Sequence, residues 1–262
     1  MKKHFLLPAL LLVGLTTTLT SCKKNKDDAV APAVEACQID YATTTLDSTK
    51  ITYDSQNRVI KEETFNNSDD SEGSLTYTYS SNKIVEDEYD ESGDLISKTE
   101  YHLNSNNNAS YSVYVEDGNT DAADTTWYLY DSNKHNTRRV TKHTTPIIGD
   151  AAIRTYDTTW YTYTGGNLSK VEVKEAGEDI QTTSYTYGSD DAKTQVFAPG
   201  QDYSHVAGLY GNPSEKLPTS ATVGTTNVSY IYEFNDKGYV TRYKVVSSAV
   251  TQSDIYLKYY CK

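Results

Sequence analysis

The residues able to act as metal ligands or acid–base groups are scattered along the chain. The five histidines are His4, His102, His135, His143 and His205, and no two of them stand at a zinc-ligand spacing. His135 and His143 flank one predicted strand, where we interpret them as polar surface residues. The sequence contains neither a Gly-x-Ser-x-Gly nucleophile motif nor a phosphate-binding loop. We therefore expect no catalytic residue, no metal site and no cofactor.

Carboxylates are abundant, but no sequence feature marks a functional set. Residues 117–121 begin like a calcium-binding loop, yet Ala122 stands where that loop needs glycine and Tyr128 where it needs glutamate. A polar hairpin loop is the better interpretation. Two acidic side chains could lie at the separation of about 5 to 10 Å that glycosidases use, although nothing singles out a pair.

Two tryptophans occupy equivalent positions in a repeated motif. The sequence Asp-Thr-Thr-Trp-Tyr stands at residues 124–128 and again at 157–161. Aromatic faces suit sugar rings, so Trp127 and Trp160 are candidates for stacking on a ligand. Their equal placement in two repeats favours instead a packing role that both copies share.

The first residues resemble an export signal. Lys2 and Lys3 precede an apolar run from Phe5 to Leu15 that is shorter than the roughly 20 residues needed to span a membrane, a pattern typical of a secretory signal. Residues 19–22, Leu-Thr-Ser-Cys, resemble the lipobox of bacterial lipoproteins, which implies cleavage before Cys22 and acylation of that residue. Several acyl chains on one residue hold a protein firmly at a membrane.

A short linker is expected between the lipid and the domain. Residues 23–28 are basic and then acidic, which resembles the surface-export signal of Bacteroidota lipoproteins; a plain solvated tether is the alternative. Residues 29–36 have linker composition. We expect a signal peptide at residues 1–21, a lipidated tether at 22–36 and a single β-sheet domain at 37–262.

With Cys22 assigned to lipid, Cys37 and Cys261 bracket the domain. Export places them where disulfides persist, and a bridge closing so long a loop stabilises by about 5 kcal/mol in the chain-entropy model. We predict the bridge; two separate buried thiols are the alternative.

Composition narrows the possible partners. The formal net charge is −12, which disfavours binding to nucleic acid and to anionic lipid surfaces. The chain has 24 Tyr against 4 Phe and 2 Trp. Tyrosine has an apolar body and a polar tip, so this ratio favours a sheet with half-buried surfaces over a deep, dry core.

Hairpin patterns fill the chain from Cys37 onward. Alternating Tyr- and Thr-rich stretches end in short turns rich in Asp, Asn and Gly, as at residues 51–61, 75–85 and 230–243. The pattern predicts an all-β fold, a long antiparallel meander of about 12–15 strands in a single curled or barrel-like sheet.

Residues 197–224 contain several Pro and Gly residues that interrupt regular strands. They predict a long loop between strands, with a short helical turn around residues 205–210. It is either a functional loop or a plug over one end of the sheet.

Two resemblances follow from these patterns. Tyr53-Asp54 with residues 57–59 resembles the YD repeats of large β-shell proteins, as do residues 234–240 with Asn235 in place of Asp. Residues 209–211, 217–219, 232–240 and 260–261 are similar to a Bacteroidota lipoprotein family, a domain of unknown function described as having a porin-like fold. The resemblance implies a fold and a location, and the family brings no established reaction or ligand.

We therefore expect a non-catalytic lipoprotein, anchored in the outer membrane by its lipid and exposed at the surface, or facing the periplasm as the alternative. Its sheet would bind a glycan, a peptide or a protein partner. The competing hypotheses are an envelope hydrolase with carboxylate catalysis and a structural or lipid-carrying component. Clustered carboxylates with a pocket on the inner face would favour the hydrolase, exposed Tyr and Trp a binder, and an apolar tunnel a carrier.

Overall fold

The computed structural model describes residues 37–116, 120–147, 151–191, 193, 204–247 and 253–261. The chain divides into two units, Met1–Ala36 and Cys37–Lys262. The predicted signal, Cys22 and the tether lie outside the described residues, so the fold concerns the second unit.

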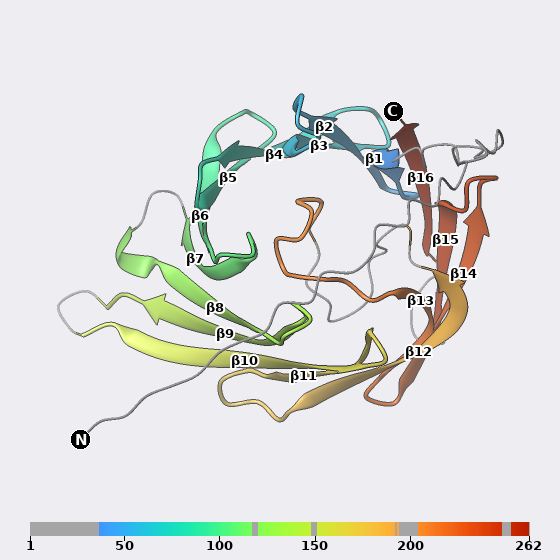
Figure 1. Ribbon diagram of the computed structural model, residues 1–262. Coiled ribbons are helices and arrows are strands. Elements are labelled where there is room, and N and C mark those ends of the chain that lie inside the picture. Colours follow the sequence, from blue (N-terminus) through green and yellow to red (C-terminus); the bar gives the residue numbers. More distant parts are fainter. Residues whose placement is uncertain are drawn as a thin grey trace, which may run out of the picture. The chain divides into compact units, whose positions relative to one another are not determined.

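The described part of this unit is a barrel of sixteen antiparallel strands. Each strand pairs with the next along the chain, and the last returns to pair with the first, which closes the sheet (Figure 1). The predicted all-β meander is confirmed, with one strand more than the upper expectation. The strands are β1 (Cys37–Thr43), β2 (Asp47–Tyr53), β3 (Val59–Asn66), β4 (Ser71–Tyr79), β5 (Lys83–Tyr89), β6 (Leu95–Leu103), β7 (Ala109–Glu116), β8 (Asp124–Tyr130), β9 (Asn136–Thr145), β10 (Ile153–Thr164), β11 (Asn167–Lys174), β12 (Gln181–Asp191), β13 (Lys216–Val223), β14 (Thr226–Phe234), β15 (Val240–Ser247) and β16 (Ser253–Cys261).

Strand β13 corrects the prediction that residues 197–224 are a loop throughout. Its Pro218 pairs opposite Tyr187 between two register shifts of the β12–β13 ladder. Proline is tolerated at such irregular positions because the regular ladder does not need its missing N–H group. The Pro218 carbonyl is still used, since it accepts a hydrogen bond of 2.7 Å from the Tyr232 hydroxyl.

Six hairpin turns share one hydrogen-bond pattern, which explains their composition. At the first, Oδ1 of Asp54 accepts the backbone N–H groups of Gln56 and Arg58 at 2.8 and 2.9 Å. Asn57 in that turn has a φ of 62°, a left-handed conformation that Asn and Gly adopt most readily. The other five turns begin at Asn66, Asp90, Asn104, Asp131 and Asn235.

Hydrogen bonds from tyrosine hydroxyls to backbone carbonyls link neighbouring hairpins. The Tyr79 hydroxyl, for example, donates to the Val59 carbonyl at 2.7 Å. Corresponding bonds run from Tyr53, Tyr130, Tyr187, Tyr232 and Tyr259 to backbone carbonyls. A phenylalanine would bury the same ring but could not make this bond, which accounts for the preference for Tyr over Phe.

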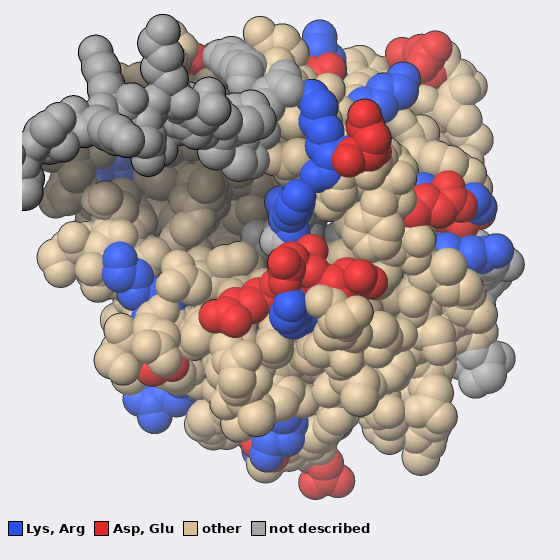
Figure 2. Space-filling model, turned by 45° about the vertical axis from the view of Figure 1, so that its right-hand side comes forward, with Lys and Arg blue, Asp and Glu red and all other residues tan. Residues whose placement is uncertain are grey.

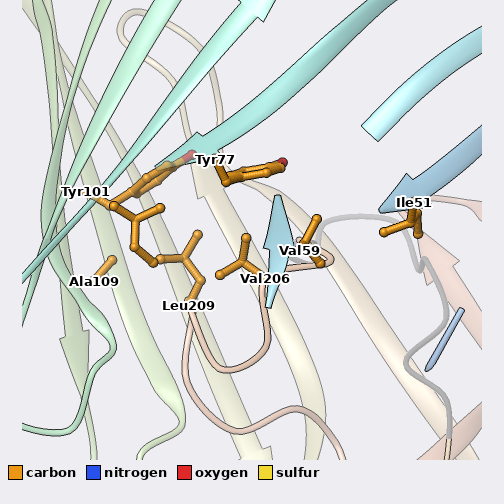
Figure 3. Packing of buried hydrophobic residues seen from close by; sticks show 8 residues of the cluster. Ile51, Val59, Tyr77, Tyr101, Ala109, Val206 and Leu209 are labelled. Carbon is orange, nitrogen blue, oxygen red and sulfur yellow. The ribbon is translucent and has the colours of Figure 1, made fainter. Parts of the chain in front are cut away.

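Residues 204–215, here called the plug segment, lie inside the ring of strands, as the orange trace in Figure 1 shows. Leu209 is 1% exposed and belongs to a core cluster with residues of β2 to β7. Figure 3 shows Leu209 beside Tyr101 and Ala109 of the wall. The Ala109 N–H also donates to the Leu209 carbonyl at 2.8 Å. The segment therefore packs inside the barrel, as expected for the plug of the two alternatives, and some of its residues also line the cavity described below.

The plug segment is held by turns and by backbone bonds to hairpin ends. Its own hydrogen bonds, from Leu209 N–H to the Val206 carbonyl and from Gly211 N–H to the Gly208 carbonyl, form two successive turns instead of the predicted helical turn. Asn212 N–H donates to the Lys134 carbonyl at 2.9 Å.

Candidate functional site

A cavity of about 530 Å³ lies between the plug segment and the barrel wall. Its volume falls in the range of roughly 300–1,000 Å³ that is typical of small-molecule sites. The wall side comes from β1 to β6 and their turns, together with β16. The lining residues are Cys37, Gln38, Ile39, Tyr53, Asn57, Arg58, Val59, Tyr79, Ser80, Ser81, Ile84, Leu103, Asn107, Lys193, Ser204, His205, Val206, Ala207 and Tyr259.

Three tyrosine side chains and several aliphatic side chains form the wall of this lumen cavity. The hydroxyls of Tyr53, Tyr79 and Tyr259 each donate to a backbone carbonyl, at 2.6 to 2.7 Å. Burial raises the pKa of Tyr79 to about 12, although the nearby Arg58 charge opposes the shift. Tyr79 is therefore uncharged at neutral pH, and the hydroxyl protons of all three tyrosines are already donated to carbonyls.

Two cationic side chains line the same cavity. The Arg58 guanidinium lies 4.4 Å from the centroid of the Tyr79 ring, and its Nε and Nη2 bind Oδ2 of Asp54 at 2.8 and 2.7 Å. Lys193 Nζ donates to the Lys237 carbonyl at 2.8 Å. Both residues are exposed, so they lie where the cavity opens to solvent.

A buried polar cluster lies beneath the plug segment, and His205 connects it to the cavity. Nδ1 of His205 and Oε2 of Glu62 are 2.8 Å apart, and the Tyr77 hydroxyl donates to Oε1 of Glu62 at 2.9 Å. Burial raises the pKa of the Glu86 carboxyl above its ordinary range; a hydrogen bond with Tyr77 opposes this shift, and the Glu62 charge reinforces it. The cluster places two carboxyl groups on the inner face of β3 and β5.

The geometry of this cluster suits docking of the plug segment better than catalysis. Both oxygens of Glu62 already have partners, and its residue is only 8% exposed. Of the described residues that line the cavity, His205 belongs to the cluster, whereas Glu62 and Glu86 do not line it. A carboxylate shielded in this way cannot reach a substrate held in the cavity.

The repeated Asp-Thr-Thr-Trp-Tyr motif builds a second polar cluster. His143 of β9 lies between the first residues of the two copies, with Nδ1 2.7 Å from Asp124 and Nε2 2.8 Å from Asp157. Partial burial lowers the pKa of His143, but the hydrogen bonds to the two carboxylates outweigh it, and the pKa is raised overall.

The interpretation of His135 as a surface residue needs correction, whereas the His143 side chain is 39% exposed, as that interpretation requires. His135 is 7% exposed and stacks on Tyr163, with ring centroids 4.2 Å apart. His143 is partly buried between its two aspartates. Period-two alternation alone could not reveal these partners, because they come from other strands and from a turn.

Trp127 and Trp160 lie outside the lumen. In each repeat the following tyrosine, Tyr128 or Tyr161, packs into an inner cluster. Successive side chains of a strand point to opposite faces, so both tryptophans face outward. Neither lines the lumen cavity. Ligand stacking by these residues stays a prediction, and it would have to occur on the outer face.

The predicted disulfide is present. Cys37 and Cys261 are bonded, with Cα atoms 4.1 Å apart, where β1 meets β16.

Among the described residues there is no group of three or more His, Cys, Asp or Glu side chains that could hold a metal ion. Residues 117–119 of the calcium-like stretch lie outside the described residues, and Thr120–Ala122 form a short 3-10 turn.

Comparison with solved structures finds the same fold in two porin-like proteins. The first, from Bacteroides uniformis, is 14% identical with a TM-score of 0.62, and the match covers 86% of this chain and 98% of that one. The second, from Bacteroides vulgatus, is 15% identical with a TM-score of 0.53, covering 84% and 98%. At this identity the likeness shows the fold alone, which confirms the porin-like fold expected from the sequence. No family model matches the chain, and no curated protein matches its sequence.

Helices contribute no membrane span within the described residues, because none there is long and apolar enough to cross a bilayer.

Proposed function

We propose that this protein is a non-catalytic lipoprotein of the cell envelope that binds a small ligand inside its plugged barrel. The observation that carries the proposal is the lumen cavity of about 530 Å³, walled by tyrosine rings and aliphatic side chains. The plug segment supports binding over passage of solutes, because Val206 and Leu209 are buried in the lumen. The likeness to porin-like proteins of Bacteroides supports the fold on which this proposal depends.

Ion pairs on the outer face of the barrel support the proposal that this face contacts water. Glu62 points inward, so its neighbours Lys61 and Glu63 point outward, where they form an ion pair of 2.7 Å. Similar outward pairs join Lys83 to Glu100, Lys98 to Asp87, Lys170 to Glu172 and Arg242 to Asp254. Figure 2 shows such positive and negative side chains beside one another on one face.

Charges on this face argue against lipid around the wall. A Lys or Arg on the lipid face of a membrane barrel costs about 2 to 4 kcal/mol at the bilayer midplane. We therefore assign membrane attachment to lipid on Cys22, with the barrel held on residues 22–36 at the outer membrane and displayed at the cell surface. Residues 1–21 act as the signal peptide in this proposal.

The ligand site is tested with a neutral fluorescent probe, N-phenyl-1-naphthylamine, added to the purified chain. We expect saturable binding that the Ala207→Trp variant weakens, because Ala207 lines the cavity from the exposed side of the plug segment and a large side chain there occupies part of the space. The matched control is Ala176→Trp, at an exposed turn elsewhere. Equal binding by the two variants would overturn the proposed site.

The anchor is tested separately by cell fractionation. We expect the Cys22→Ala protein to leave the membrane fraction and the natural chain to remain in it. Digestion by protease added to intact cells would support surface display over a periplasm-facing orientation. A Cys22→Ala protein that stays in the membrane fraction would refute attachment through lipid.

A further inference from the structure

We propose that the ligand of the lumen cavity is an amphipathic anion, with an apolar body and one carboxylate or similar acidic group. This inference rests on the proposed function, since it names the ligand class of the same site. It follows from two properties of the lining, the aliphatic and aromatic surface of the wall and the presence of cations where the cavity opens.

The wall selects for an apolar body. Ile39, Val59, Ile84, Leu103 and Val206 present hydrocarbon surface to the cavity. The lining tyrosines add ring surfaces, and each of their hydroxyl protons is already donated to a carbonyl. A neutral glycan would lose water from many hydroxyl groups here. The aliphatic and tyrosine surfaces offer those groups no donor, so only the few polar side chains of the lining, such as Ser81 and Asn107, would replace that water. Burying an unpaired hydroxyl costs about 1 to 3 kcal/mol. A body without hydroxyl groups avoids that cost.

The charges at the cavity select for an anion. The whole chain carries 36 Asp and Glu against 24 Lys and Arg. Among the described residues that line the cavity, the ratio is reversed, with Arg58 and Lys193 and no Asp or Glu. Such a local reversal in an acidic protein attracts a negatively charged group to the opening.

Both cations retain donor capacity for a ligand. Asp54 engages Nε and Nη2 of Arg58, so Nη1 takes no part in that pair. The Lys193 ammonium has three hydrogens, and its bond to the Lys237 carbonyl uses one. The acidic Asp191, two residues before Lys193, is itself paired with Lys216. Each of the two cations therefore has a donor left for an acidic group at the cavity.

His205 is positioned to support the site without supplying the charge. It lines the cavity, but its Nδ1 already faces Oε2 of Glu62 at 2.8 Å, so that atom is engaged within the wall. The pair holds the plug segment against β3, which fixes one side of the cavity. The anion is therefore assigned to Arg58 and Lys193.

The experiment compares three twelve-carbon probes that differ only in the head group: dodecanoate, dodecanol and dodecylamine. Each is used below its micelle concentration to displace N-phenyl-1-naphthylamine from the Cys22→Ala chain, which lacks acyl groups that would take up amphiphiles. We expect dodecanoate to bind most tightly and dodecylamine least. In the Arg58→Gln/Lys193→Gln variant, affinity for dodecanoate falls by about tenfold, or about three- to fivefold for each exposed charge pair, while affinity for dodecanol is unchanged.

The control variant is Lys50→Gln/Lys244→Gln, which removes the same charge from other strands and should leave all three affinities unchanged. Unaltered circular dichroism and melting temperature show that the variants are folded. Equal binding of dodecanoate and dodecanol, unaffected by the loss of Arg58 and Lys193, overturns the anionic class and leaves the proposed function standing. Failure of the neutral probe to bind the natural chain overturns both.

Discussion

The plug segment is predicted to stabilise the barrel through Leu209, and Leu209→Ala tests this directly. The substitution removes three carbon atoms from a side chain that is 1% exposed. At about 0.8 kcal/mol for each buried methylene the transfer loss is about 2.4 kcal/mol, and the cavity left behind adds to it, within the range of about 2 to 5 kcal/mol for such changes. We expect a loss of about 3 kcal/mol in the free energy of unfolding.

Urea denaturation and thermal melting measure this loss. For a domain of this size, about 3 kcal/mol corresponds to a decrease in melting temperature of about 6 to 12 °C. The matched control is Leu46→Ala, because Leu46 is 71% exposed and should change stability by less than about 0.5 kcal/mol. Equal stabilities of the two variants would refute the packing of Leu209 in the lumen.

Hydrogen exchange shows whether the plug segment opens by itself. The Ala109 amide donates to the Leu209 carbonyl, so its exchange rate reports on docking of the plug segment. If Leu209→Ala accelerates exchange at Ala109 but not at amides in the β10–β11 ladder, the plug undocks locally. If both accelerate together, plug and wall unfold as one unit.

Three further perturbations follow from the described contacts. Cys37→Ser/Cys261→Ser should lower the free energy of unfolding by about 3 to 5 kcal/mol in urea titration, because the bridge closes a loop with a sequence separation of 224 residues; an unchanged midpoint would contradict this. Glu86→Gln should stabilise the protein at pH 7, since burial raises the pKa of this carboxyl and the folded state favours its neutral form. The gain in the free energy of unfolding should vanish near pH 4. The control Glu72→Gln, at an exposed site, should show no such pH dependence. The imidazole of His143 should titrate by NMR with a pKa above 6.5. Its contribution to stability should be complete below pH 6.5 and lost as the pH rises through the pKa of the folded state. A midpoint below 6.5 would contradict the pairing of His143 with Asp124 and Asp157.

Local chemistry made most of the fold predictable. In six hairpins an Asp or Asn opens the turn, and in four of them an Asn or Gly accepts the positive φ, as Asp54 and Asn57 do in the first. A chain of hairpins leaves each strand beside its sequence neighbours, so the meander follows. Strand β13 was missed because Pro218 argues against a strand. The irregular ladder that accommodates this proline depends on β12, which precedes β13 but is separated from it by residues 192–215.

The candidate site was much less predictable. Arg58, Lys193 and His205 come from distant segments, and only the curvature of the closed sheet and insertion of the plug segment bring them to one cavity. Val206 and Leu209 were a usable signal, since apolar residues among Pro and Gly breakers indicate a segment that packs against something. The outward orientation of Trp127 could also have been predicted from the sequence, because successive side chains of a strand point to opposite faces and the adjacent Tyr128 points inward.

The pairing of β1 with β16 gives the barrel an unusual order of assembly. Every other ladder joins strands adjacent in the sequence and can form as soon as its hairpin is available, whereas the β1–β16 pairing needs both ends of the domain. Long-range pairing is slow because the loop-closure entropy must be overcome first. Until the last strand arrives, β1 and β15 expose unpaired edges that invite pairing with other chains. A chain truncated before β16 should therefore accumulate as an open, self-associating sheet, because only pairing of β16 with β1 closes the barrel.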